Sequence, residues 1–191
     1  MQNVIDTLRS QSASHVEKLK EWLRIPSVST DSNQKGEVRR AGEFVRDELA
    51  DAGFEVRIDE TPGHPVVLAK WHGAEGAPTL LVYGHYDVQP PEPLELWRHG
   101  AFEPTIEGDD LIARGSTDDK GQALALVLGI GGVLRETGSL PINVTFLIEG
   151  EEEIGSPNLA PYIDAHLDEL KADIALISDC TQFGPRMPAI T

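Results

Sequence analysis

The sequence contains one cysteine, few basic residues and no long apolar run, and each shortage argues against a class of protein. The single cysteine, Cys180, cannot form an internal disulfide and fits the reducing cytoplasm, where we expect the protein to lie. The 16 lysines and arginines are outnumbered by 32 aspartates and glutamates, which argues against nucleic-acid binding through phosphate neutralisation. The apolar runs are shorter than the roughly 20 residues that span a bilayer. The first residues lack the basic and apolar blocks of a signal peptide, so we expect no membrane association.

The sequence has an excess of negative charge, and the chain is long enough to form a folded domain. At 191 residues it could form one large domain or two small ones, and a domain of this size buries roughly 70% of its unfolded surface. Apolar residues make up 40% of the chain and charges are scattered along it, which is typical of a globular protein. A net charge of −16 fits a protein whose own carboxylates hold cations.

The hydrophobic pattern predicts strands that alternate with helices. Helical spacing of apolar residues predicts helices over Val4–Ile25, Glu37–Ala52, Gly121–Arg135 and Asn158–Leu170. Alternating or continuous apolar runs predict strands over Phe54–Asp59, Pro65–Gly73, Thr79–Tyr83, Asp110–Gly115, Ile142–Ile148 and Asp173–Ser178. Because several of these strands are continuously apolar, we expect an α/β sheet that is covered by helices on both faces.

Polar side chains follow three of the predicted strands, at the point where each strand ends. The motif GHYD (84–87) follows the strand at 79–83, EGEEE (149–153) follows the strand at 142–148, and Asp179 follows the last strand. A further acidic pair, Asp118 and Asp119, precedes the helix predicted from Gly121. Since ligands of open α/β sheets bind outside the carboxyl ends of the strands, we expect these four segments to meet in one crevice.

One imidazole among carboxylates is a donor set for a divalent metal. It suits zinc, manganese or cobalt better than calcium, which prefers oxygen ligands alone. His85 and Asp87 are two residues apart in an extended segment and project on the same side, so Asp87 could accept the imidazole N–H and orient the ring. Glu152 and Glu153 are neighbours that must diverge, so one can bind metal while the other serves as a general base.

Each of these residues also has an interpretation without chemistry. The acidic run could be a solvated helix start, His85 a packed strand-end histidine, and Asp179 a loop acid. Asp118 and Asp119 could cap the following helix, a role compatible with metal binding. A magnesium phosphohydrolase also needs clustered acids, but the imidazole and the lack of a phosphate cradle disfavour it.

Four motifs resemble those of the two-zinc family of amidohydrolases and peptidases. They are GHYDVQP (84–90), ARGSTDDKG (113–121), EGEEEIGS (149–156) and ISDC (177–180). The family includes carnosinase-like dipeptidases, carboxypeptidase G, aminoacylase, acetylornithine deacetylase and succinyl-diaminopimelate desuccinylase. The full form of GHYDVQP, together with IPSVS (25–29), PLELW (93–97) and AFEPTIEGDDLIARG (101–115), is most similar to the dipeptidase branch.

The resemblance implies a fold and a role for each matching residue. The fold would be an incomplete three-layer α/β/α sandwich with a mostly parallel mixed sheet. The metal ligands would be His85, Asp118, Glu153 and Asp179, with Asp118 bridging two ions and joined to Asp119 by a cis peptide bond. His85 and Asp179 would share one ion, and Glu153 would bind the other. Glu152 would be the general base and Asp87 would orient His85.

The implied activity is hydrolysis of the peptide or amide bond of dipeptides or N-acyl amino acids. It would use a metal-bridging water, Glu152 and two zinc ions per complete site, with manganese or cobalt as substitutes. The family's second ion takes a further histidine from a chain more than double this length. We therefore expect residues 1–191 to be the N-terminal part of the catalytic domain.

The lid or dimerisation domain and the C-terminal part of the catalytic domain would then lie elsewhere. We expect the parent protein to be a homodimer and this chain alone to be nearly inactive. The alternative is a non-catalytic metal-binding remnant or interaction module derived from such an enzyme. The presence of Glu152, which binds no metal in the implied scheme, argues against that alternative.

Overall fold

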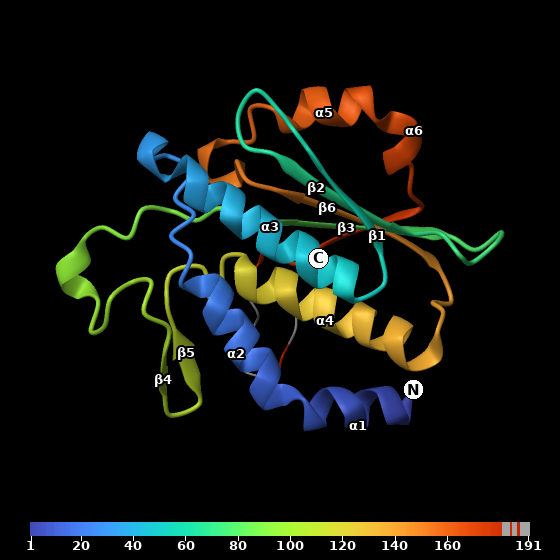
Figure 1. The fold of residues 1–191 in the computed structure, drawn as a ribbon, viewed down its shortest axis with the longest axis horizontal. Coiled ribbons are helices and arrows are strands. Elements are labelled where there is room, and N and C mark those ends of the chain that lie inside the picture. Colours follow the sequence, from blue (N-terminus) through green and yellow to red (C-terminus); the bar gives the residue numbers. More distant parts are fainter. Residues whose placement is uncertain (181–183, 185–186, 188–191) are drawn as a thin grey trace.

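Five strands form the main sheet, in the spatial order β1-β2-β6-β3-β7 (Figure 1). The structure is a computed structural model and describes residues 1–180, 184 and 187. The strands are β1 (Glu55–Asp59), β2 (Val66–Trp71), β3 (Thr79–His85), β6 (Asn143–Glu149) and β7 (Ile174–Ile177). β2 is antiparallel to β1 and β6, whereas β3 is parallel to β6 and β7. The predicted mostly parallel mixed sheet is confirmed, because β1, β6, β3 and β7 run in the same direction and only β2 is reversed.

Helices lie on both sides of this sheet, as predicted for a three-layer sandwich (Figure 1). One side carries α1 (Gln2–Ser10), α2 (Ser12–Leu23), α3 (Lys35–Asp51) and α4 (Lys120–Thr137). The other side carries α5 (Leu159–Ala165) and α6 (Leu167–Leu170). A separate hairpin of β4 (Thr105–Glu107) and β5 (Asp110–Ile112) lies beside the loop that follows β3. Three short 3-10 turns complete the described elements: η1 (Ser32–Gln34), η2 (Leu94–Leu96) and η3 (Glu152–Ile154).

The central strands are continuously apolar because each supplies two cores. Successive side chains of a strand point to opposite faces of the sheet. On β2, Val67 and Ala69 therefore pack into the core shared with α3 and α4, while Val66 and Leu68 pack with Tyr162 on the opposite face. This arrangement holds the carboxyl ends of β3 and β6 rigidly at one rim of the sheet.

Two predicted helices are each divided in two at a residue near which a side chain contacts the backbone. The helix predicted over Val4–Ile25 breaks at Gln11, where the hydroxyl groups of Ser10 and Ser14 donate to main-chain carbonyls. Serine hydroxyl groups that bond the backbone in this way compete with regular helix. The helix predicted over Asn158–Leu170 breaks at His166, whose ring contacts the carbonyl of Tyr162 at 2.8 Å. In an unbroken helix that carbonyl would accept from the N–H of residue 166.

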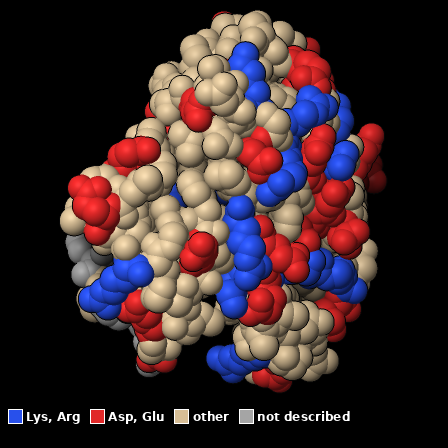
Figure 2. All heavy atoms as spheres, turned by 60° about the vertical axis from the view of Figure 1, so that its left-hand side comes forward, with Lys and Arg blue, Asp and Glu red and all other residues tan. Residues whose placement is uncertain are grey.

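Charged side chains of both signs are interspersed on the face shown in Figure 2. Many basic groups form local ion pairs. Arg39, for example, contacts Glu43 at 3.0 Å and Glu60 at 2.7 Å. Among the residues that the structure describes, no helix is both long enough and apolar enough to cross a membrane.

Candidate metal centre

His85 is fully buried at the carboxyl end of β3, and its ring has a defined orientation. The ring atom Nδ1 lies 3.1 Å from the main-chain oxygen of Asp87. A carbonyl oxygen can only accept a hydrogen bond, so this contact assigns the hydrogen to Nδ1. Once Nε2 gives up its proton, its lone pair faces the rim of the sheet, which is the form that binds a metal ion.

Carboxylates from three other segments surround Nε2 of His85. The nearest oxygen of Asp118, just before α4, is 3.1 Å away, that of Asp179, after β7, is 3.5 Å away, and that of Glu152, in η3, is 4.0 Å away. Ligand atoms of His85, Glu152 and Asp179 lie within 4.8 Å of one another, and so do those of His85, Asp118 and Glu153. The structure thus brings together every residue that the sequence marked as a metal ligand or base.

The electrostatics of this cluster favour a cation. Burial alone would lower the pKa of His85, but Asp87, Asp119 and Asp179 outweigh it and raise the pKa to about 10. Burial raises the pKa of Glu152 and of Glu153, and neighbouring acids add to both shifts. Carboxylates in this state are stabilised by any positive charge placed among them. A proton and a metal ion would compete for the same lone pair of His85, so the donor set and its charge fit a divalent ion.

Asp87 lies beside His85 and makes further contacts that were not predicted. Its carboxylate oxygen lies 3.4 Å from Nδ1, farther than its own main-chain oxygen. The two carboxylate oxygens also accept the backbone N–H groups of Glu152, at 3.2 Å, and Glu153, at 3.1 Å. Asp87 is therefore shared between the imidazole and the acidic turn.

The run of acids after β6 divides into two structural acids and two site acids. Glu149 is buried and accepts from the hydroxyl groups of Tyr83 and Ser156, both at 2.7 Å. Glu151 is also buried and accepts from the backbone N–H of His64 at 3.0 Å and from an Asn158 amide at 2.8 Å. Only Glu152 and Glu153 face the rim, because the first two carboxylates are directed inward by these hydrogen bonds.

Asp119 supports the site in a way that the sequence did not show. Its Oδ2 accepts the backbone N–H of His85 at 3.2 Å, and its Oδ1 is buried without a partner among the described residues. Burial raises the pKa of Asp119 to about 7, although His85 acts against this shift. The cap role considered for Asp119 is wrong, because its side chain makes no hydrogen bond to the start of α4. Its peptide bond to Asp118 is cis, as the family resemblance implied.

Lys120 is a second supporting residue that sequence reasoning missed. Its side chain is fully buried and donates to the main-chain oxygens of Ile25, at 2.8 Å, and Trp22, at 3.1 Å. Burial lowers the pKa of Lys120 to about 7. The contacts join the start of α4, and hence Asp118, to the end of α2.

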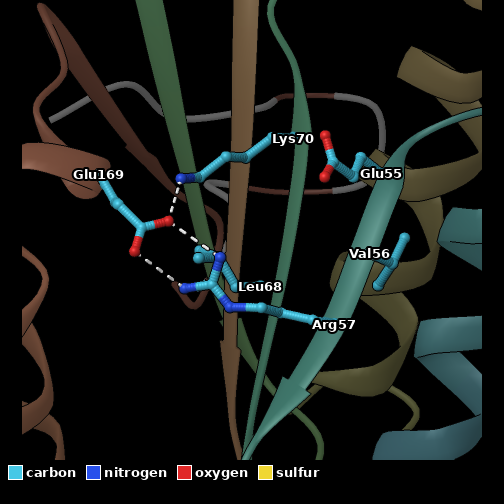
Figure 3. Close-up of a pocket in the computed structure, with 6 residues that line it drawn as sticks. All are labelled: Glu55, Val56, Arg57, Leu68, Lys70 and Glu169. Carbon is cyan, nitrogen blue, oxygen red and sulfur yellow. Dashed lines mark hydrogen bonds and ion pairs between the residues drawn. The ribbon is translucent and has the colours of Figure 1, made fainter.

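A separate hollow of about 200 Å³ lies over β1 and β2, away from this rim (Figure 3). In Figure 3, Arg57 and Lys70 both point toward the carboxylate of Glu169. Glu169 accepts from Arg57 at 2.9 and 3.1 Å and from Lys70 at 2.5 Å. Arg57, Lys70 and Glu169 in this hollow already satisfy one another, so the candidate site remains the rim around His85.

A mixed sheet between two helical layers, with an imidazole and carboxylates at its carboxyl edge, defines an α/β protein whose rim could hold a metal ion. The chain belongs to peptidase family M20/M25/M40, whose sequence model matches residues 81–188. The resemblance inferred from the four motifs is thereby confirmed.

Known relatives agree with this assignment. The chain is 31% identical over 208 residues to a Cys-Gly metallodipeptidase of Candida albicans, covering 100% of this chain and 43% of the relative. It is 37% identical over 136 residues to a succinyl-diaminopimelate desuccinylase of Methylobacterium sp. (strain 4-46), covering 69% of this chain and 33% of the relative. The crystal structure of human carnosine dipeptidase 1 matches with a TM-score of 0.86 at 29% identity, covering 94% of this chain and 41% of that chain. The chain thus spans about two fifths of the length of these dipeptidases.

Proposed function

We propose that this chain carries most of the metal centre of a dipeptidase. One observation carries the proposal: Nε2 of His85 lies within 4.0 Å of carboxylates from three separate segments, in a chain that belongs to a peptidase family. His85, Asp118, Glu153 and Asp179 would hold two divalent ions, with zinc preferred and manganese or cobalt as substitutes. When bound, such ions polarise the scissile carbonyl and lower the pKa of water toward about 7.

Glu152 is the proposed general base. It sits on η3 beside the ligands, and its side chain is 37% exposed, so a water molecule at the rim can reach it. Because burial raises its pKa, Glu152 binds a proton more strongly than a free glutamate does. It can therefore take a proton from the attacking water and return it to the leaving amine. Asp87 would keep His85 and Glu152 in place during both transfers.

The proposed substrates are dipeptides, with N-acyl amino acids as the second class. The Candida albicans relative is a Cys-Gly metallodipeptidase by name, and the Methylobacterium relative is a succinyl-diaminopimelate desuccinylase by name. Metal ligands beside a general base could act on any small amide. The residues at the rim therefore do not distinguish dipeptides from N-acyl amino acids. We place dipeptides first because that match covers the whole chain.

We further propose that residues 1–191 form the N-terminal part of the catalytic domain. The chain matches about two fifths of its dipeptidase relatives, which leaves room for another ligand and for a lid or dimerisation domain. On this proposal the parent protein is a cytoplasmic homodimer, and the chain alone hydrolyses substrate far more slowly than the parent.

The test is hydrolysis of Cys-Gly, β-Ala-His and an N-succinyl amino acid, with zinc, manganese or cobalt and with a chelator. A phosphate ester serves as the comparison substrate. We expect metal-dependent amide hydrolysis by the parent protein, and about a hundredfold or greater loss of kcat in Glu152→Gln. Glu75→Gln, an exposed glutamate in the loop after β2, is the matched control and keeps full activity. Metal binding without hydrolysis in the parent would favour the non-catalytic remnant instead.

A further inference from the structure

We propose that the segment from His85 to Gln89 positions the turn that carries Glu152 and Glu153. Asp87 holds the backbone of this turn and Gln89 holds the side chain of Glu153. The consequence for metal binding rests on the proposed function, whereas the contacts themselves rest on geometry alone.

Asp87 supplies the cap that the turn η3 lacks. The residue before η3, Glu151, makes no side-chain cap bond, because its carboxylate is bound to His64 and Asn158. The first N–H groups of a helical turn have no partner within the turn. Asp87 is fully buried beneath them, and each of its two oxygens accepts one N–H, from Glu152 and from Glu153. A buried carboxylate with two such bonds fixes the direction of both glutamates.

The ring of His85 has a nearer partner than this carboxylate. Its Nδ1 contacts the main-chain oxygen of Asp87 at 3.1 Å, and the carboxylate oxygen is farther away, at 3.4 Å. The main-chain oxygen is present whatever the side chain at position 87. Replacing the Asp87 carboxylate should therefore disturb the glutamate turn first and the imidazole second.

Gln89 completes the positioning from the surface. Its backbone N–H donates to one carboxylate oxygen of Glu153 at 3.2 Å, and its side-chain amide donates to the other. Gln89 is exposed, whereas Asp87 is buried, so one contact to the turn lies at the surface and the other in the interior. Glu153 is thus oriented toward the rim before any ion arrives.

Pre-orientation of this kind changes metal affinity. Partners that hold a ligand in place typically alter affinity by about 10- to 100-fold when they are removed. Gln89 acts on Glu153 alone, while Asp87 acts on both the ligand Glu153 and the base Glu152. Both are positioning residues, since they act through the two glutamates.

The contacts of Asp87 can be tested by NMR without metal or substrate. In Asp87→Asn we expect the backbone amide protons of Glu152 and Glu153 to move upfield, because each loses a hydrogen bond to a charged oxygen. The ring-nitrogen shifts of His85 should still report hydrogen on Nδ1. Asp31→Asn is the matched control, since Asp31 accepts the N–H of Asn33 in the turn η1. Loss of the hydrogen on Nδ1 of His85, with unmoved glutamate amides, would overturn the proposal.

The role of Gln89 is measured by cobalt(II) titration, followed by absorption, in Gln89→Ala. We expect cobalt affinity to fall by about tenfold. Gln2→Ala is the matched control, because Gln2 also donates its amide to a carboxylate, that of Asp6 at 2.9 Å on α1. Unchanged cobalt affinity in Gln89→Ala would refute this part of the proposal. This surface variant should fold even if changes at the buried Asp87 do not. Neither readout needs hydrolysis, so this inference and the dipeptidase proposal can fail separately.

Discussion

Lys120 supports the metal centre without facing it. Its ammonium group donates to the carbonyls of Trp22 and Ile25 and lies 5.9 Å from the centre of the Trp22 ring. These carbonyls end α2, where a positive charge is favoured by the helix dipole. The next residues toward the N-terminus are Asp119 and Asp118, so the position of the rim depends on this buried contact.

We predict that Lys120→Met destabilises the fold by about 1–3 kcal/mol. Two buried carbonyls would lose their donor, and this loss outweighs the relief from no longer burying an amine. Urea denaturation followed by circular dichroism measures the change. Lys171→Met, at an exposed lysine, is the control and should shift the midpoint little. Equal stability of Lys120→Met and the unsubstituted chain would show that the contact of Lys120 with the two carbonyls does not stabilise the fold.

The sequence predicted which site residues meet at the ends of strands. It did not predict the directions in which the neighbouring acidic side chains point. His85 and Glu153 follow strands whose carboxyl ends share one edge, so their meeting follows from topology. The inward course of Glu149 and Glu151 depends on hydroxyl, amide and backbone donors contributed by distant residues. Asp119 looked like a helix cap from its position, but the adjacent strand offered the N–H of His85 instead. These choices are made by tertiary contacts, which the local pattern does not contain.

At the level of elements, Glu169 joins α6 to β1 and β2, two neighbouring strands at one side of the sheet. It accepts from Arg57 on β1 and Lys70 on β2 (Figure 3). The hydrogen bond from Arg57, followed by that from Lys70, lowers the pKa of Glu169 to about 2. Since this pKa is lower than the ordinary value of 4.5, ionisation of Glu169 stabilises the folded state above about pH 4.5. The contribution is lost as the pH falls from there toward 2.

We predict that Glu169→Gln lowers the free energy of unfolding by about 1 kcal/mol at pH 7, a small value because the side chain is partly exposed. The difference in stability from the unsubstituted chain should shrink as the pH is lowered below 4.5, where Glu169 of the unsubstituted chain loses its charge. Denaturant titrations at several pH values provide the measurement. Glu75→Gln should show no such convergence, and a pH-independent difference at Glu169 would contradict the assigned cause.

Element types followed from the sequence more closely than element ends. The strand patterns predicted all five strands of the main sheet, because its central strands are apolar on both faces and β1 alternates apolar and charged residues. The two divided helices were predicted as continuous, because their apolar spacing continues through Gln11 and His166. At the second break the ring of His166 contacts the carbonyl of Tyr162, while the backbone N–H of His166 donates to Ile163, and periodicity does not register this exchange.

At the level of the whole molecule, the two edges of the main sheet differ in character. The β1 edge carries alternating charges, including Arg57 paired with Asp59 and Glu169. The β7 edge carries Ile174 and Ile177, which are 59% and 58% exposed. In the part of the chain that the structure describes, β7 pairs with β3 on one side only. Charges protect an edge strand from pairing with another chain, whereas an apolar edge invites it.

We predict that residues 1–191 self-associate through β7 and that Ile177→Lys weakens this association. A lysine on the exposed edge places like charges opposite each other when two copies of the strand approach, and it removes apolar area that association would bury. Sedimentation velocity over a range of concentrations should show a smaller share of dimer or larger species in Ile177→Lys than in the unsubstituted chain. Leu96→Lys is the matched control, because Leu96 is 76% exposed on η2 and lies outside the main sheet. If Leu96→Lys reduces association and Ile177→Lys does not, the loop after β3 rather than the sheet edge is the contact surface. If the unsubstituted chain stays monomeric at all concentrations, the prediction is wrong and the apolar β7 edge remains exposed to water without causing association.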